Sequence, residues 1–131
     1  MLKSIIIVTF VIRQLTLVEP VYRQQLGYRT VAQGTVTPDL VESWDAPAMA
    51  GRRFVLMQPA SGAEVYLRFI EGPASAQEPL GLTTHGWNSA ELLIQDPDRL
   101  AAQLRTSPLE VIGPPMDLYE KPRSPRRVRP M

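Results

Sequence analysis

The feature that most constrains the fold of this chain is a pattern that occurs twice. An apolar, β-branched stretch runs directly into an amphipathic helix pattern at residues 3–27, and again at residues 89–107. Ile12-Arg13-Gln14 and Ile94-Gln95-Asp96 occupy equivalent places at the two turns. Such an internal repeat predicts two related supersecondary modules that share one core.

The first copy begins with a strand over Lys3 to Ile12, whose apolar run is too short to span a bilayer and is followed by no cleavage site. Thr16 and Glu19 have the spacing of a capping box, which places Pro20 in the first helical turn. Gly27 is placed to end the helix in a left-handed turn. The inward stripe of this helix is expected to be Val18, Tyr22 and Leu26.

Three more strands are expected in the first copy. Residues 28–37 read as one strand, and residues 52–59 and 63–71 as two more, joined by the short hairpin Ala60-Ser61-Gly62. Residues 38–51 are irregular with one helical turn, and connections of this length are often lids or binding loops. Trp44 from this connection lies over a pocket or plugs the edge of the core.

The second copy predicts a strand over Ser89 to Gln95 and then a helix. Asp96 is a suitable N-cap, Pro97 fits the first helical position, and Asp98 lies near the positive end of the helix dipole. The inward stripe is expected at Leu100, Ala101 and Leu104, and a further strand follows Pro108. The pattern then stops two strands early, which leaves an open sheet edge that a partner must cover.

Length and composition fit one globular domain of four segments. The chain has 131 residues, of which 44% are hydrophobic and 21% charged. We expect a first module over residues 1–72, a linker over 73–85, the start of a second module over 86–116, and a basic tail over 117–131 that is disordered or truncated. The absence of cysteine leans toward the cytoplasm and excludes disulfides and thiolate chemistry.

The charge of the chain is unevenly distributed. Residues 1–119 hold 9 Lys/Arg against 12 Asp/Glu, whereas Lys121, Arg123, Arg126, Arg127 and Arg129 crowd the tail. No aromatic side chains interleave these arginines and no recognition helix precedes them, so nucleic acid is not an expected partner. The tail reads as a solvated end of the chain.

These elements together resemble the vicinal oxygen chelate superfamily, which includes glyoxalases, bleomycin-resistance proteins and dioxygenases. The likeness rests on "VIRQLTLVEPVYRQQLGYRTV", "AEVYLRFIE", "GWNSAELLIQDPDRLAAQL" and "LEVIGPP". It covers nearly residues 1–116, although Gln14 stands where the family usually has Asp. The resemblance implies an α+β fold: a βαβββ module and an incomplete second βαβ module form a curved mixed sheet, a cup with the helices on its outer face.

Enzymes of this family hold a divalent metal in the cup through His, Gln or Glu on four strands. The corresponding positions here are Ile7, Arg68 and Ser89, and the fourth strand is absent from the sequence. An aliphatic chain cannot coordinate, a guanidinium repels a cation and a serine is a poor lone ligand. The only histidine, His85, is four residues from the nearest position, roughly 13 Å along a strand. We therefore expect no metal and no cofactor.

The metal positions of the resembled family, extended by alternation along the strands, imply what the cup contains instead. The inward positions are Ile7, Thr9, Val11, Tyr66, Arg68, Ile70, Ser89, Glu91 and Leu93. The positions that face the helices are all apolar: Val8, Phe10, Ile12, Val65, Leu67, Phe69, Ala90, Leu92 and Ile94. Arg68 and Glu91 either form a structural ion pair or bind a ligand, with Arg68 as an anchor for an anion and Glu91 as a tentative catalytic base.

The leading hypothesis is a metal-independent protein that binds a small organic anion in the cup and forms a homodimer. Arg68, Tyr66, Glu91, Ser89, Trp87, Trp44 and Thr9 are its candidate ligand-binding residues. A second hypothesis is a metal-dependent lyase, isomerase or dioxygenase with ligands from a partner subunit or from missing strands. A third is an inactive, truncated fragment.

Overall fold

The computed structural model describes residues 4–73, 89–116, 118–119 and 127–128. The chain divides into two compact units, residues 1–88 and 89–131. Most of the linker expected at residues 73–85 lies outside the described residues.

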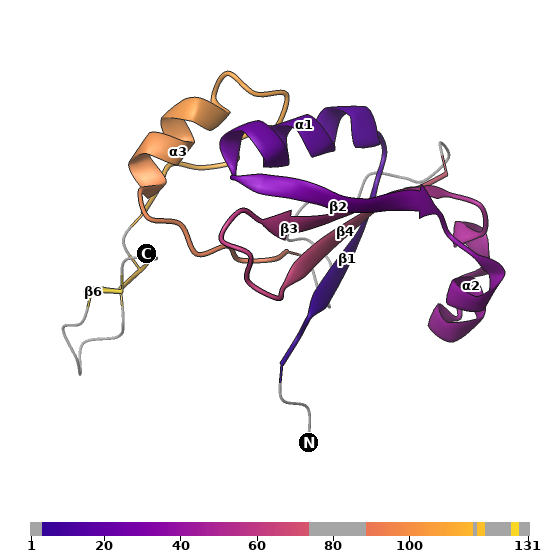
Figure 1. The fold of residues 1–131 in the computed structure, drawn as a ribbon. Coiled ribbons are helices and arrows are strands. Elements are labelled where there is room, and N and C mark those ends of the chain that lie inside the picture. Colours follow the sequence, from indigo (N-terminus) through magenta and orange to yellow (C-terminus); the bar gives the residue numbers. More distant parts are fainter. Residues whose placement is uncertain (1–3, 74–88, 117, 120–126, 129–131) are drawn as a thin grey trace. The chain divides into compact units, whose positions relative to one another are not determined.

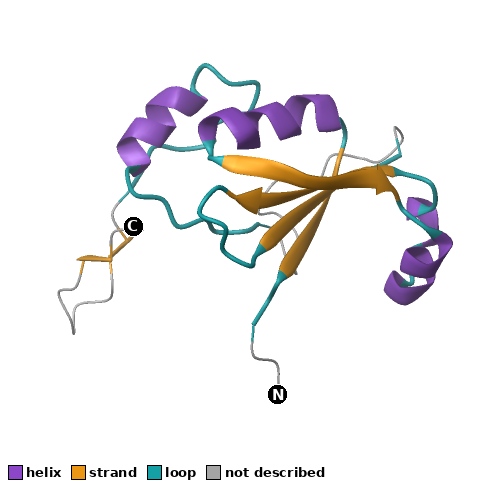
Figure 2. Ribbon diagram, viewed as in Figure 1, coloured by secondary structure: helices purple, strands orange, loops and turns teal. Residues whose placement is uncertain are grey.

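The first unit is a four-stranded mixed sheet with helices, so the expected α+β class is confirmed (Figures 1 and 2). Its elements are, in chain order, β1 (Ile7–Ile12), α1 (Leu15–Gln25), β2 (Tyr28–Thr35), α2 (Pro38–Trp44), the 3-10 helix η1 (Pro47–Met49), β3 (Arg53–Pro59) and β4 (Tyr66–Glu71). The strand order across the sheet is β1-β4-β3-β2. The pair β1–β4 is parallel, and the other two pairs are antiparallel.

The core of this unit lies between α1 and one face of the sheet, as Figure 2 shows. The buried side chains of α1 are Leu15 and Val21, whereas Val18, Tyr22 and Leu26 of the expected stripe are half-buried. The Tyr22 ring contacts Phe69 of β4 with centroids 4.7 Å apart, and Phe69 in turn stacks on Phe10 of β1. These aromatic contacts fix which face of β1 and β4 the helix covers.

The capping box expected at Thr16 and Glu19 is wrong. The helix begins at Leu15, and its N-cap residue Gln14 makes no side-chain cap hydrogen bond. Thr30 of β2 donates a hydrogen bond to Glu19 Oε1 at 2.5 Å. Glu19 is therefore used for a tertiary contact rather than a local cap, and Pro20 lies inside the helix rather than in its first turn. Gly27 has the expected left-handed conformation, with φ of 67°.

Residues 36–51 leave the sheet and return to it as a closed excursion. Val36 donates to the carbonyl of Arg52, and Gly51 donates to the carbonyl of Val36. The segment holds two turns of α2 and then η1, which is more helix than the single turn expected. Asp45 ends α2 in a left-handed conformation, with φ of 50°. Hydrogen bonds from Asp45 N to Glu42 O and from Ala46 N to Val41 O complete a Schellman-type end.

The connection from β3 to β4 spans residues 60–65, twice the length of the expected hairpin. Gln58, the buried polar residue of β3, donates its side-chain amide to the carbonyls of Gly62 and Ala63. It accepts a hydrogen bond from Arg29 of β2. A turn that depends on one side chain four and five residues away leaves no simple two- or three-residue signature.

In the second unit the expected helix is confirmed, but the expected strands are not formed. Helix α3 (Pro97–Leu104) is capped by Asp96, whose Oδ1 accepts from Arg99 N at 2.9 Å. Residues 89–95 and 109–113 are irregular, because a strand needs a neighbour to complete its hydrogen bonds and the described residues supply none there. Two-residue strands β5 (Leu118–Tyr119) and β6 (Arg127–Val128) pair within the expected tail.

Candidate functional site

The pairing of β1 with β4 sets which side chains share a face. Ile7 lies opposite Tyr66, Thr9 opposite Arg68, and Val11 opposite Ile70. Directly paired residues project to the same side of a sheet. Phe10 and Phe69, each one residue further along its strand, contact each other on the side of the sheet where Tyr22 of α1 lies. Thr9 and Arg68 therefore lie on the side away from α1, as predicted.

Strand β3 adds two residues to this side, since Phe54 pairs with Ile70 and Leu56 pairs with Arg68. We call this surface the Arg68 face. It comprises Ile7, Thr9, Val11, Phe54, Leu56, Tyr66, Arg68 and Ile70. Its exposure is uneven: Val11 is 54% exposed, whereas Ile70 is 1% exposed. Arg68 is the one charged residue among these eight. The same side of the sheet continues toward β2 with Gln58 and its partner Arg29, which donates a hydrogen bond to Gln58.

Trp44 reaches Arg68 from the end of α2. The guanidinium carbon of Arg68 lies 4.9 Å from the centroid of the Trp44 ring, a cation–π contact. The left-handed turn at Asp45 follows Trp44 directly and so fixes where the helix presents this ring. Residues distant in sequence, one from the excursion and one from the sheet, are thereby brought together.

The Arg68 guanidinium is incompletely satisfied. Its Nε atom is buried and has no hydrogen-bond partner, and no described carboxylate forms an ion pair with it. Burial lowers the pKa of Arg68 below its ordinary value. A guanidinium remains charged at neutral pH, so this side of the sheet presents a cation without a counter-ion among the described residues.

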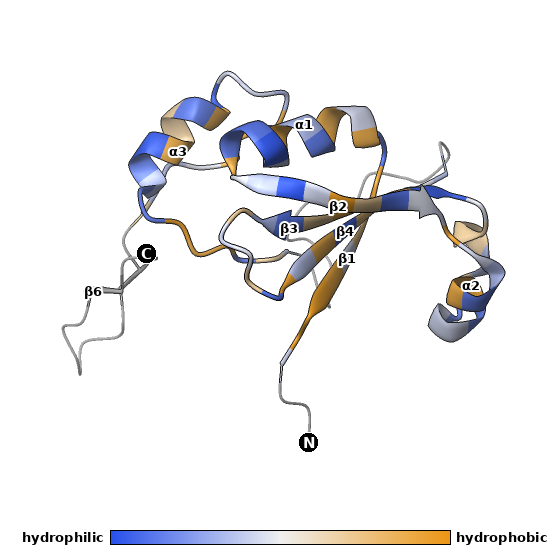
Figure 3. Cartoon of the chain, in the orientation of Figure 1, coloured by the Kyte–Doolittle hydropathy of each residue, from blue (hydrophilic) through white to orange (hydrophobic). Residues whose placement is uncertain are grey.

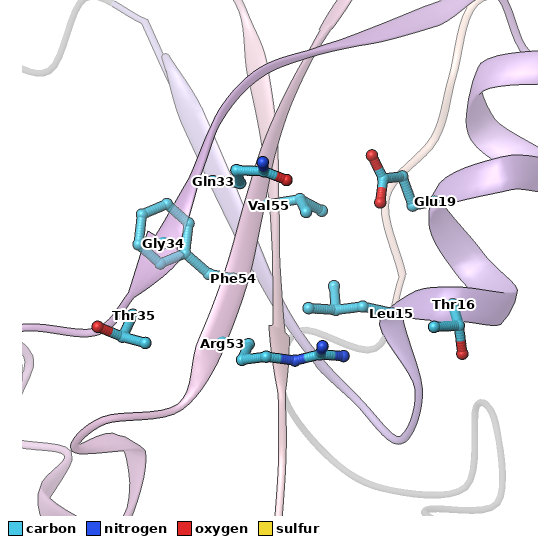
Figure 4. A pocket seen from close by; sticks show the side chains of 9 residues that line it. All are labelled: Leu15, Thr16, Glu19, Gln33, Gly34, Thr35, Arg53, Phe54 and Val55. Atoms are coloured by element: carbon cyan, nitrogen blue, oxygen red, sulfur yellow. The ribbon is translucent and has the colours of Figure 1, made fainter.

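A surface hollow lies beside α1, β2 and β3 (Figure 4). It measures about 410 Å³ and has Leu15 and Val55 among its lining residues. Its two charged groups already have partners: Arg53 pairs with Glu71 at 2.9 Å, and Glu19 is bound by Thr30. No group in this hollow is left in need of a ligand as Arg68 is, so the Arg68 face is the better candidate.

The structure brings together four of the seven residues predicted to bind a ligand. Arg68, Tyr66 and Thr9 share the Arg68 face, and Trp44 contacts Arg68. Glu91 and Ser89 are exposed and belong to the second unit, so their pairing with Arg68 and the role of Glu91 as a base stay predictions. Trp87 and His85 lie outside the described residues.

Sequence reasoning missed Phe54 and Leu56. The alternation of β3 identifies two sets of residues, but only its register with β4 decides which set lies beside Arg68. That register follows from the six-residue connection and Gln58, whose geometry the sequence does not specify. The sequence offered one signal for these residues: the alternation of β3 places Phe54, Leu56 and Gln58 on one side of the strand.

The residues at the metal positions of the resembled family do not fit a metal. An unpaired guanidinium occupies the β4 position, and Ile7 occupies the β1 position beside Tyr66. Within residues 4–73 and 89–116, no three His, Cys, Asp or Glu side chains gather closely enough to share an ion.

Compared with protein-family models, with curated proteins and with solved structures, the chain has no match. In the described part of the chain, no helix has the length and apolar character needed to cross a bilayer.

Proposed function

We propose that this protein binds a small organic anion on the Arg68 face without a metal ion. The observation that carries this proposal is the buried, unpartnered Nε of Arg68 beside Trp44. A buried donor without an acceptor costs roughly 1–3 kcal/mol, which a carboxylate oxygen would recover while neutralising the charge.

The proposal includes the fold expected from the resemblance. Residues 4–73 would be a βαβββ module of the vicinal oxygen chelate type, with the Arg68 face as the inner side of half a cup. The element order, the strand order β1-β4-β3-β2 and the parallel pairing of β1 with β4 support this assignment. An anion anchor would replace the metal of the enzymatic relatives.

We also propose that a second copy of the chain covers the edge strand β1. From Ser4 to Ile12 the sequence has no charge, and β1 is apolar except at Thr9 (Figure 3). Ile5 is 53% exposed and Ile6 is 55% exposed. Natural edge strands usually carry a charge, a proline or a bulge, as β2 does between Thr30 and Ala32.

The test is anion binding by the full chain and by two arginine variants. Arg68→Gln removes the charge of the proposed anchor. Arg29→Gln is the matched control, since Arg29 also lies on the sheet but already donates to Gln58. Isothermal titration calorimetry with phenylacetate should show binding to the parent chain and to Arg29→Gln.

For Arg68→Gln we expect binding at least about tenfold weaker, the equivalent of one charged hydrogen bond. Circular dichroism establishes that both variants are folded. If the parent chain and a folded Arg68→Gln variant bind phenylacetate with equal affinity, the proposal is wrong.

A further inference from the structure

The surroundings of Arg68 carry information about the class of anion. In the sheet register, the direct neighbours of Arg68 are Thr9 on β1 and Leu56 on β3. The next positions along β4 on the same face are Tyr66 and Ile70. Arg68 thus supplies one positive charge, and Thr9 and Tyr66 supply hydroxyl groups among apolar neighbours.

A phosphate or another dianion fits this arrangement poorly. Phosphate sites usually combine several backbone N–H groups or more than one cation. The other two arginines on the strands of the sheet already have partners: Arg29 donates to Gln58, and Arg53 pairs with Glu71. One guanidinium matches one carboxylate in charge and in planar geometry.

Trp44 limits how a carboxylate can approach. The guanidinium carbon lies over the Trp44 ring, 4.9 Å from its centroid, so the indole closes one side of the cation to a ligand. A carboxylate that pairs with Arg68 would have to approach from a side that the indole leaves open, and the rest of the ligand would lie against the sheet. There it would meet the apolar side chains of the Arg68 face, of which Val11 is 54% and Ile7 39% exposed.

We infer that the preferred ligand is a monocarboxylate with an apolar body. This inference rests on the proposed function, because it requires Arg68 to be the anion anchor. The carboxylate pairs with Arg68 and the body covers the exposed apolar residues of β1 and its neighbours. Removing that apolar area from water provides the selectivity over acetate.

The experiment compares phenylacetate, acetate and inorganic phosphate as ligands of the full chain. We expect phenylacetate to bind at least about tenfold more tightly than either of the others, because its ring buries apolar surface on both partners. If acetate or phosphate binds as tightly as phenylacetate and Arg68→Gln abolishes that binding, the inference fails and the proposed function stands. If none of the three binds, both fail.

A matched pair of variants locates the body of the ligand. Val11→Thr places a hydroxyl on the Arg68 face at nearly constant volume. Val31→Thr makes the same change on β2, at the opposite edge of the sheet, where Val31 is 42% exposed. Val11→Thr should weaken phenylacetate binding and leave acetate binding unchanged, whereas Val31→Thr should affect neither. Equal effects of the two variants on phenylacetate would overturn the inference.

Discussion

At the scale of single residues, Arg68 brings both a cost and a gain to the stability of the fold. Its buried Nε lacks an acceptor, and burial lowers the pKa of its guanidinium. The cation–π contact with Trp44 offsets part of this cost and stabilises the fold by about 0.5–2 kcal/mol. A residue kept where it destabilises the fold is typical of a functional site.

Arg68→Met should therefore stabilise the free protein or leave its stability unchanged. Methionine fills similar space and needs no hydrogen-bond partner, so we expect a free energy of unfolding up to about 1 kcal/mol higher. Urea denaturation of the parent and the variant measures this difference. A loss of 2 kcal/mol or more would mean that Arg68 is a structural residue instead.

Tyr22 makes the stability of the first unit sensitive to alkaline pH. Burial raises the pKa of Tyr22, and the nearby phenol of Tyr28 raises it further. A raised folded-state pKa gives stability that is complete below the unfolded value of about 10 and is lost as pH rises through the folded value. The free energy of unfolding should fall above pH 10 in the parent and fall less in Tyr22→Phe; equal slopes would contradict this account.

At the scale of elements, prediction succeeded where neighbours in the sequence determine the structure. The α3 cap at Asp96, the left-handed Gly27, and the faces of β1 and β4 follow from local chemistry and alternation. It failed where a distant partner decides. Glu19 bonds to Thr30 rather than to its own helix end, and residues 89–95 have a strand pattern but pair with no strand in the described part of the chain.

The contact between Trp44 and Arg68 could be predicted only in part from the sequence. The sequence suggested Trp44 as a wall, and Arg68 followed from the resemblance, but only the α2 excursion brings them within 4.9 Å. Its end depends on a left-handed Asp45, which a sequence pattern does not reveal because many residues can follow a helix.

The end of α2 can be tested at Asp45. Asp45→Val should lower the free energy of unfolding by about 1–2 kcal/mol, because a β-branched residue is strained at positive φ. Asp45→Gly is the control that keeps the conformation, and it should preserve or raise stability. Thermal denaturation followed by near-ultraviolet circular dichroism reports both the stability and the Trp environment. A Val variant as stable as the Gly variant would contradict the proposed role of the turn.

At the scale of the whole molecule, the uncharged edge strand β1 predicts association. Sedimentation of the full chain at high micromolar concentration should show a dimer. Ile7→Lys places a charge on this strand and should yield a monomer, whereas Leu17→Lys, on the exposed side of α1, should not. A parent chain that remains monomeric would contradict the proposed pairing.

The most direct test of the central claim is the Arg68 Nε–H resonance in ¹⁵N-labelled full-length protein, assigned by its loss in Arg68→Gln. We predict that phenylacetate shifts this resonance saturably, as expected when a carboxylate pairs with the guanidinium. The Arg29 Nε–H resonance should remain in place. An Arg68 resonance that stays unchanged while phenylacetate binds elsewhere would contradict the account.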